Sequence, residues 1–447
     1  MGIFKAYDIR GVVPDELGPA EAYRIGRGCA RFLGEGPVAV GRDARPHSPD
    51  LAGELIRGIR DEGLGVVDLG LVSTPMLYYA VDHLGAGGGV MVTASHNPAR
   101  YNGFKICREH AIPVGGETGL GTIEALAAER GKAQPVEPRG ELRSASVAEG
   151  YAEHVLRLVG GSLPPLRAIC DCGNGMASVG LRPLLARTPL RAECLYEEPD
   201  GTFPNHEADP LKPENLRDLV EAVRRHGADF GVAFDGDADR AVFVDDRAEP
   251  IPSDRITALL ARRILRDHPG GRVLYDLRSS RVTREEVGAA GGVPEMCRVG
   301  HSFVKARMRE TGAVFGGELS GHYYFRFSET LCADDGVAAF AALAALLGEE
   351  GRPLSELVAP LRRYAASGEI NRKVDDVEAV LARVEAHYAD ARISHLDGLL
   401  VEYPEWWFNL RPSNTEPVLR LNLEAPTVEE MERRRDEVLA LVGGSPA

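Results

Sequence analysis

Three aspartates at alternate positions stand between two apolar segments of this chain. Residues 229–234 (Asp-Phe-Gly-Val-Ala-Phe) and 241–244 (Ala-Val-Phe-Val) are predicted strands, and residues 235–240 (Asp-Gly-Asp-Ala-Asp-Arg) connect them. Apolar strands on both sides limit the exposure of the connection, and its carboxylates repel one another by about 1 to 4 kcal/mol per close pair. A positive charge is therefore expected among Asp235, Asp237 and Asp239.

The chemistry of this acidic loop favours a metal ion over a solvated turn. An EF-hand calcium loop also spaces acidic residues in this way, but it needs glycine where Arg240 stands, glutamate where Asp246 stands, and helices on both flanks. Oxygen ligands that leave coordination positions open suit Mg²⁺, which usually keeps places for water or a phosphate oxygen. The loop is predicted to bind Mg²⁺.

Predicted strands and helices alternate along most of the chain, which is typical of an α/β layer structure. Helices are expected at residues 19–33 and 48–63, and strands at 37–41 and 65–69. Linkers are predicted at residues 134–140 and 348–368. The last segment is smaller and of α+β type, with strands at 370–374, 399–401 and 406–410 and a helix at 377–389. The predicted domains are residues 1–138, 139–248, 249–352 and 353–447.

A serine stands where another predicted strand ends. Residues 87–92 end in an apolar run, and residues 93–98 (Thr-Ala-Ser-His-Asn-Pro) follow, with Asn-Pro forcing a turn. A serine in a turn is most often only a turn former. Phosphorylation of Ser95, however, would explain why other motifs of the chain have the residues needed to bind phosphate, a metal ion or a sugar. An Asn-Gly turn at residues 102–103 is expected to bring Lys105 beside it.

Two later motifs are suited to a sugar and a phosphate. Glu318, Ser320 and His322 alternate beside glycines, so they can face one cleft and bind sugar hydroxyls. Residues 411–417 (Arg-Pro-Ser-Asn-Thr-Glu-Pro) combine a bidentate arginine with hydroxyl, amide and backbone donors, which makes a cup for a phosphate. Residues 41–45 (Gly-Arg-Asp-Ala-Arg) end a strand and are either ligand-binding or a charged turn.

Charge and cysteine usage restrict the partners and the compartment. The formal net charge of -15 argues against nucleic acid and anionic membranes, so an anionic substrate must be bound by local basic residues. The seven dispersed cysteines suit free thiols in a reducing compartment, and Cys170-Asp-Cys172 lacks the spacing of a metal pair. The N-terminus lacks the apolar segment of a signal peptide, so a cytoplasmic location is expected.

Taken together, these motifs resemble those of the α-D-phosphohexomutase family, in particular its bacterial phosphomannomutase/phosphoglucomutase members. The resemblance extends from residues 7–11 (Tyr-Asp-Ile-Arg-Gly) to residues 411–417. It implies three related mixed α/β domains and a smaller C-terminal α+β domain that moves like a lid, all placed around a central active-site cleft.

The resemblance also implies roles for individual residues. Ser95 is the phosphoserine, and its phosphate binds Mg²⁺ together with Asp235, Asp237 and Asp239. The groups around the transferring phosphate are Arg10, His96, Lys105, Arg240, Arg278 and His301, with Lys105 or His301 as candidates for proton transfer. The substrate contacts are Tyr7, Arg278, Glu318, Ser320 and His322, with Arg411, Ser413, Asn414 and Thr415 holding the phosphate that does not react.

The implied activity is the interconversion of hexose 1-phosphate and hexose 6-phosphate through a 1,6-bisphosphate, which also activates the enzyme by phosphorylating Ser95. Leu319 is closer to the methionine of enzymes that act on mannose and glucose than to the glutamine of phosphoglucosamine mutases. The alternatives are a phosphoglucosamine mutase, a Mg²⁺-dependent sugar phosphatase with a serine nucleophile, and a non-catalytic sensor of sugar phosphate or metal. Sugar phosphates are the expected partners, and either a monomer or a dimer is compatible with the sequence.

Overall fold

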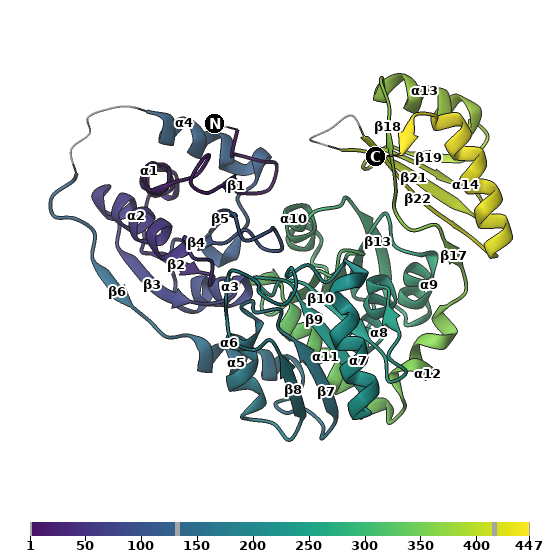
Figure 1. Cartoon of the computed structure of the whole chain (residues 1–447), viewed down its shortest axis with the longest axis horizontal. Coiled ribbons are helices and arrows are strands. Elements are labelled where there is room, and N and C mark those ends of the chain that lie inside the picture. The colour runs from purple at the N-terminus through teal and green to yellow at the C-terminus, as the bar shows by residue number, and fades with distance from the viewer. Residues whose placement is uncertain (1, 130–134, 414–417, 447) are drawn as a thin grey trace. The chain divides into compact units, whose positions relative to one another are not determined.

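The computed structural model describes residues 2–129, 135–413 and 418–446 of the chain (Figure 1). These described residues form two compact units. The first unit contains the chain up to Ser253, Gly300–Gly316 and Ser320–Ser355. The second unit contains Asp254–Val299, Gly317–Leu319 and the chain from Glu356 onward.

The first sheet of the first unit is mixed, with strand order β1-β5-β4-β2-β3-β6. Strand β2 runs parallel to β3 and β4, whereas β5 runs antiparallel to β4 and β1. Every residue of β4 is buried, as expected for a strand covered on both faces, so the turn that carries Ser95 begins in the interior of the sheet. The strands are β1 (Ile9–Val12), β2 (Val38–Arg42), β3 (Val66–Leu71), β4 (Gly88–Val92), β5 (Tyr101–Arg108) and β6 (Leu142–Ser144).

Helices α1 and α2 pack side by side on this sheet and share its apolar core (Figure 1). Their backbones approach so closely that a Cβ atom on Gly58 would lie 2.2 Å from the carbonyl oxygen of Tyr23, and one on Gly26 would lie 2.2 Å from that of Leu55. The helices of this part are α1 (Pro19–Leu33), α2 (Ser48–Asp61), α3 (Thr74–His83) and α4 (Gly121–Ala128), with short helical turns at Glu109–Ala111 and Gly116–Leu120.

The second sheet, also in the first unit, has the order β11-β10-β9-β7-β8. Strands β7, β8 and β9 are parallel, and β10 returns antiparallel to β9, so the acidic loop is the connection between two fully buried neighbours. The strands are β7 (Arg167–Asp171), β8 (Arg191–Leu195), β9 (Phe230–Phe234), β10 (Ala241–Val244) and β11 (Pro250–Ile251). The helices are α5 (Ala148–Leu158), α6 (Ala177–Leu185) and α7 (Arg217–His226), with a short helical turn at Pro213–Leu216 before α7.

The remainder of the first unit is built around α11 (Gly336–Glu350), which is buried from Gly336 to Leu347. Asp335 caps this helix by accepting a hydrogen bond from the backbone N–H of Ala338 at 2.8 Å. Among the described residues, no helix combines the length and apolarity needed to cross a membrane. The other elements are α10 (His301–Thr311), β14 (Phe315–Gly317), β15 (Tyr323–Arg326) and β16 (Cys332–Asp334). The unit ends within α12 (Leu354–Val358), and the helical turn at Ala359–Leu361 that follows belongs to the second unit.

The second unit joins a βαβ segment to a C-terminal sheet of order β19-β20-β21-β22-β18-β23, in which β17 also pairs with β22. The guanidinium of Arg281 fixes this junction by donating to the carbonyl oxygens of Pro404 and Trp406, at 2.5 and 3.0 Å. The βαβ segment comprises α8 (Ser253–Asp267), β12 (Arg272–Asp276), α9 (Arg281–Ala289) and β13 (Val293–Cys297). The C-terminal elements are β17 (Ala365–Ala366), β18 (Ile370–Lys373), α13 (Val377–His387), β19 (Arg392–Ser394), β20 (Leu399–Glu402), β21 (Trp407–Pro412), β22 (Val418–Ala425), α14 (Val428–Val442) and β23 (Ser445–Pro446).

Two predictions about local structure are wrong. The predicted Asn102–Gly103 turn is part of strand β5, because both residues are paired with β1 across the sheet. The predicted linker at 348–368 contains helix α12 and the strand β17. Most other predicted helices and strands are confirmed to within about two residues, although the helix at Thr74–His83 was not predicted from the sequence.

The crossing of α1 and α2 provides a test of the packing. Replacing Gly58 by alanine places a methyl group against the backbone of α1, so we expect a loss of about 1 to 3 kcal/mol in the free energy of unfolding. Gly53 lies on the same helix, and a methyl group added there would have no atom within 4 Å, so Gly53→Ala is expected to be neutral or to stabilise by up to about 1 kcal/mol. Denaturant unfolding measures the free energy of unfolding of both variants. Equal values for Gly58→Ala and Gly53→Ala would contradict this packing of α1 against α2.

Candidate active site

The three aspartates of the acidic loop gather in the interior of the first unit. Asp235, Asp237 and Asp239 are all 0% exposed, and each offers a carboxylate oxygen within 4.8 Å of the others. Ala238, between the last two, has a φ of 63°, a left-handed conformation that tightens the loop. Among the described residues, Asp237 Oδ1 and Asp239 Oδ1 have no hydrogen-bond partner. Buried carboxylate oxygens arranged in this way fit a hard divalent cation.

Lys105 supplies a positive charge to the acidic loop. Its ammonium on β5 lies 2.6 Å from Asp237 Oδ2 and 2.5 Å from Asp239 Oδ2, and the side chain is buried. Burial by itself lowers the pKa of Lys105, but Asp237, Asp239 and Asp235 outweigh it and raise the pKa above that of an ordinary lysine. The Lys105 ammonium therefore balances part of the negative charge of these carboxylates.

Ser95 lies directly beside the same loop. Its hydroxyl donates to Asp235 Oδ2 at 2.7 Å, and the Nδ1 atom of His96 is 3.2 Å from the hydroxyl oxygen. Ser95 has a φ of 50°, a conformation that a residue with a side chain adopts mainly where its surroundings enforce it. Arg240, burial and Arg10 lower the pKa of His96 well below its usual value, so this imidazole is neutral.

Arg45 enforces the conformation of the Ser95 turn. This guanidinium is 1% exposed and forms an ion pair with Asp43 at 3.0 Å. It donates to the carbonyl oxygens of Ser95, Asn97, Pro98 and Tyr101, at 2.7 to 3.0 Å. Residues 41–45 are therefore more than a charged turn, because they hold the backbone on which Ser95 is presented.

Thr74 is a contributor that the sequence analysis did not identify. It opens helix α3, where its hydroxyl donates to Asp237 Oδ2 at 2.6 Å and its backbone N–H donates to the carbonyl oxygen of Asp237 at 3.0 Å. The partially positive N-terminus of α3 thus faces the acidic loop. Thr-Pro after a serine marks a helix start, but nothing in the sequence connects it to a loop 163 residues further along the chain.

Arginines flank the turn and the loop. Arg10 forms an ion pair with Asp8 at 2.8 Å and donates to Asn97 Oδ1 at 2.6 Å, next to Ser95. Arg240 Nε is 3.8 Å from Asp235 Oδ2 and donates to His322 Nε2 at 3.0 Å. The structure therefore places both predicted arginines close to Ser95 and its neighbours.

The bonds of His322 define its tautomer. Nε2 accepts from Arg240, and Nδ1 lies 3.1 Å from Asp334 Oδ2, so Nδ1 carries the proton. Asp239, His322 and Asp334 could in principle hold a second cation. The Lys305 ammonium, however, lies 2.8 Å from Asp334 Oδ1 and already balances that carboxylate. The Asp334–His322 contact is therefore better described as an electrostatic contact of the imidazole with a carboxylate that Lys305 already balances.

Two further predicted residues lie next to His322. The ring of His301, at the start of α10, is stacked with that of His322 at 6.1 Å between centroids, and the ring of Tyr7 lies 6.0 Å from that of His301. Burial and Lys305 lower the pKa of His301 well below its usual value, so it is neutral. Ser320 belongs to the same unit and is partly exposed.

The second unit holds the remaining predicted residues. Arg278 pairs with Asp276 at 2.8 Å, and the backbone N–H of Leu319 donates to the same carboxylate at 2.8 Å. Arg411 lies on β21, where burial and Arg278 lower its pKa. Among the described residues, Arg411 Nε has no hydrogen-bond partner. Glu318 is buried, Ser413 is partly exposed, and Asn414 and Thr415 lie outside the described residues.

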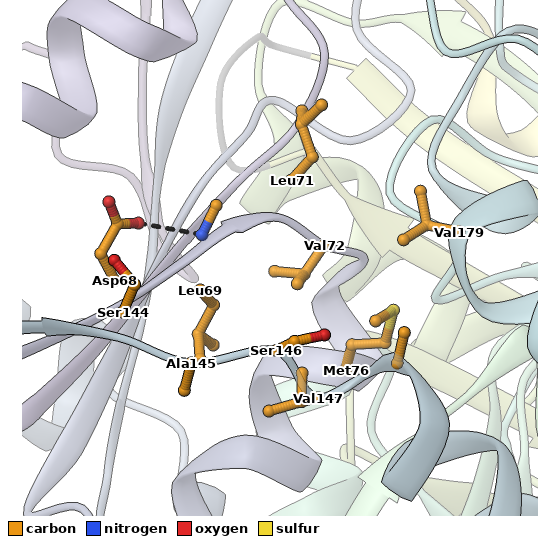
Figure 2. A pocket seen from close by; sticks show the side chains of 12 residues that line it. Asp68, Leu69, Leu71, Val72, Met76, Ser144, Ala145, Ser146, Val147 and Val179 are labelled. Carbon is orange, nitrogen blue, oxygen red and sulfur yellow. Dashed lines mark hydrogen bonds between the residues drawn. The ribbon is translucent and has the colours of Figure 1, made fainter.

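A hollow of about 370 Å³ elsewhere in the first unit contains none of these residues (Figure 2). Its lining is largely apolar, and its one carboxylate, Asp68, already accepts a hydrogen bond from the backbone N–H of Gly70 at 2.9 Å. Val72 and Met76 contribute to this lining on either side of Thr74 in the sequence. This hollow therefore offers fewer groups for chemistry than the acidic loop does.

The contact between Thr74 and Asp237 provides a test of the site. Thr74→Val keeps the shape of the side chain but removes its hydroxyl, so a carboxylate of the candidate metal site loses a partner that orients it. We expect the affinity for Mg²⁺ or Mn²⁺ to fall about 10-fold. Thr74→Ser retains the hydroxyl and is expected to bind like the unchanged protein. Isothermal titration calorimetry measures the metal affinity of both variants. Wild-type affinity in Thr74→Val would show that this hydrogen bond does not affect binding of the cation.

Comparison with known proteins supplies independent information. The models of the phosphoglucomutase/phosphomannomutase family match the chain in order, with alpha/beta/alpha domain I at residues 1–134, domain II at 149–248, domain III at 252–364 and the C-terminal domain at 369–441. A protein of Xanthomonas campestris pv. campestris described as "Phosphohexose mutases" is 45% identical over 447 residues, covering 99% of both chains. The phosphomannomutase/phosphoglucomutase of Pseudomonas aeruginosa is 40% identical over 440 residues, covering 96% of this chain and 93% of its own length.

A solved structure gives the same result. The phosphoglucomutase/phosphomannomutase family protein of Burkholderia thailandensis matches with a TM-score of 0.89 and 34% identity, covering 99% of this chain and 98% of its own. The predicted α/β fold class and the phosphohexomutase activity are confirmed by these matches. The chain belongs to the phosphoglucomutase/phosphomannomutase family.

Proposed function

We propose that this phosphohexomutase moves a phosphoryl group between Ser95 and a hexose monophosphate. Phosphorylated Ser95 donates its group to the free hydroxyl of the bound sugar phosphate, which forms a hexose 1,6-bisphosphate. The bisphosphate turns over, and Ser95 takes back the phosphoryl group from the other end. The observation that carries the proposal is the 2.7 Å hydrogen bond between the Ser95 hydroxyl and Asp235, within a buried group of three carboxylates.

Charge balance supports a phosphate at Ser95. A phosphoserine brings nearly two negative charges to a place that already holds three aspartates. Asp235, Asp237, Asp239 and that phosphate would hold Mg²⁺, and its charge together with those of Lys105, Arg240 and Arg10 would neutralise these negative charges. When bound, Mg²⁺ supplies electrostatic stabilisation to the phosphate oxygens. Phosphoryl transfer requires little beyond alignment and such stabilisation.

The proton of the attacking sugar hydroxyl needs an acceptor. Lys105 and His301 are the candidates from the sequence, and the raised pKa of Lys105 favours an imidazole. His301 is kept neutral by burial and Lys305. The Nε2 atom of His322 is already occupied, because it accepts a hydrogen bond from Arg240. We assign proton acceptance to His301 and treat Lys105 as part of the charge balance.

The second unit supports a site for the phosphate that does not react. The positive charge of Arg278 lowers the pKa of Arg411, so the two guanidinium groups repel each other. An anion bound between them would relieve this repulsion. Arg411 Nε is a buried donor without a partner among the described residues. We therefore propose that Arg411, Ser413, Asn414 and Thr415 bind this phosphate and that Tyr7, Glu318, Ser320 and His322 bind the sugar.

Further parts of the proposal rest on the sequence. The four domains have the boundaries given above, and the last moves as a lid. A hexose 1,6-bisphosphate phosphorylates Ser95 before turnover begins. Leu319 favours mannose or glucose phosphates over glucosamine phosphate, and the free thiols suit a cytoplasmic location. A panel of the three sugar phosphates assayed side by side ranks the substrates.

A mutase and a serine-dependent phosphatase give different products. With mannose or glucose 1-phosphate, Mg²⁺ and a trace of the 1,6-bisphosphate, we expect the 6-phosphate as the product, measured by phosphorus NMR. Ser95→Ala removes the acceptor and is expected to lower turnover about 10³-fold or more. Ser144→Ala, which changes an exposed serine on β6, is the matched control.

Inorganic phosphate as the chief product would favour a phosphatase and contradict the proposal. Unchanged turnover in Ser95→Ala would remove Ser95 from the mechanism.

A further inference from the structure

Three cysteine thiols meet at one edge of the second sheet. Cys170 on β7 stands opposite Cys194 on β8 in the parallel register, and Cys172 follows two residues after Cys170. Side chains two residues apart in an extended chain lie on the same face. The thiols of Cys170 and Cys172 are both close enough to Cys194 to affect its pKa. No step of the proposed phosphoryl transfer uses any of these thiols.

The three thiols differ in exposure and in charge. Cys170 and Cys172 are 0% exposed, whereas Cys194 is partly exposed on β8, an edge strand of its sheet. The neighbouring thiols of Cys170 and Cys172 lower the pKa of Cys194 to about 4 against the effect of burial, and Arg182 acts in the same direction. A thiolate that solvent can reach and that has a second thiol beside it is the arrangement found at oxidation-sensitive cysteines.

We propose that Cys194 is a site of reversible oxidation, at which a hydroperoxide oxidises the thiolate and Cys170 or Cys172 closes a disulfide. In the first step the Cys194 sulfur attacks the peroxide, the O–O bond breaks, and a sulfenic acid and the hydroxide or alkoxide of the peroxide are formed. In the second step the thiol of Cys170 or Cys172 attacks the sulfenic sulfur. An S–S bond forms and water leaves. A thiol reductant reverses the reaction by exchange.

The disulfide would act on the acidic loop through the turn that follows Cys172. The backbone N–H of Met176, at the end of this turn, donates to the carbonyl oxygen of Gly236 at 2.9 Å. A Cβ atom on Gly175 would lie 2.8 Å from the same oxygen, so the two backbones are already in contact. Because Gly236 lies between Asp235 and Asp237, a displacement of the turn shifts the aspartates. This effect on activity rests on the proposed function, whereas formation of the disulfide does not.

Oxidation of the full-length protein with hydrogen peroxide tests the disulfide directly. We expect the intact mass to fall by two hydrogen atoms. Peptide mapping without reductant is expected to link Cys194 to Cys170 or Cys172, and dithiothreitol should reverse the link. Cys194→Ser is expected to abolish it, whereas Cys29→Ser, which changes a buried thiol in the first sheet's core, should retain it. Oxidation of Cys194 to a sulfinic acid without a disulfide, or no reaction at Cys194, would overturn the proposal.

A second measurement tests the connection to the acidic loop. Oxidised protein is expected to lose turnover several-fold, with recovery in dithiothreitol and no loss in Cys194→Ser. A complete disulfide with unchanged turnover would contradict the connection. If the reduced protein has no mutase activity, the proposed function fails, while the mass and mapping results still decide whether the oxidation site exists.

Discussion

The buried contact between Lys105 and the acidic loop is the interaction on which the rest of the first unit depends. Carboxylates removed from water are strongly disfavoured unless cations and hydrogen bonds replace the solvent. Lys105 meets Asp237 and Asp239 at 2.6 and 2.5 Å, and Thr74 adds a hydroxyl to Asp237. The lysine comes from the first sheet and the aspartates from the second. Their ion pairs therefore join the two sheets at the place where Ser95 is presented.

The Ser95 turn shows how the fold maintains an unfavourable local conformation. A residue with a side chain at a φ of 50° needs support, and Arg45 supplies it by donating to several carbonyl oxygens of the turn, including those of Ser95 and Asn97. A buried arginine would itself be costly, but Asp43 pairs with it. The serine is thus held by a network that does not include its own hydroxyl, which remains available for chemistry beside Asp235.

The sequence predicted the positions of most elements and the acidic loop, because apolar runs, glycines and aspartates at fixed spacing are local signals. Long-range pairing was harder to predict. The Asn102–Gly103 pair favours a turn locally, yet pairing with β1 makes it part of a strand. Thr74 and Arg45 act on residues far along the chain, and nothing in their neighbourhood indicates which residues they contact. The ion pairs of Lys105 with Asp237 and Asp239 could not be predicted from the sequence either, because they join residues more than 100 positions apart.

The central claim is that Ser95 carries the phosphoryl group during turnover. The protein is mixed with Mg²⁺ and isotope-labelled hexose 1,6-bisphosphate, and the reaction is quenched at short times. Mass spectrometry then follows the Ser95 peptide while the 6-phosphate forms. The account predicts that phosphorylated Ser95 peptide appears at least as fast as the 6-phosphate and that its label exchanges with the substrate. Formation of the 6-phosphate while the Ser95 peptide remains unmodified throughout would contradict it.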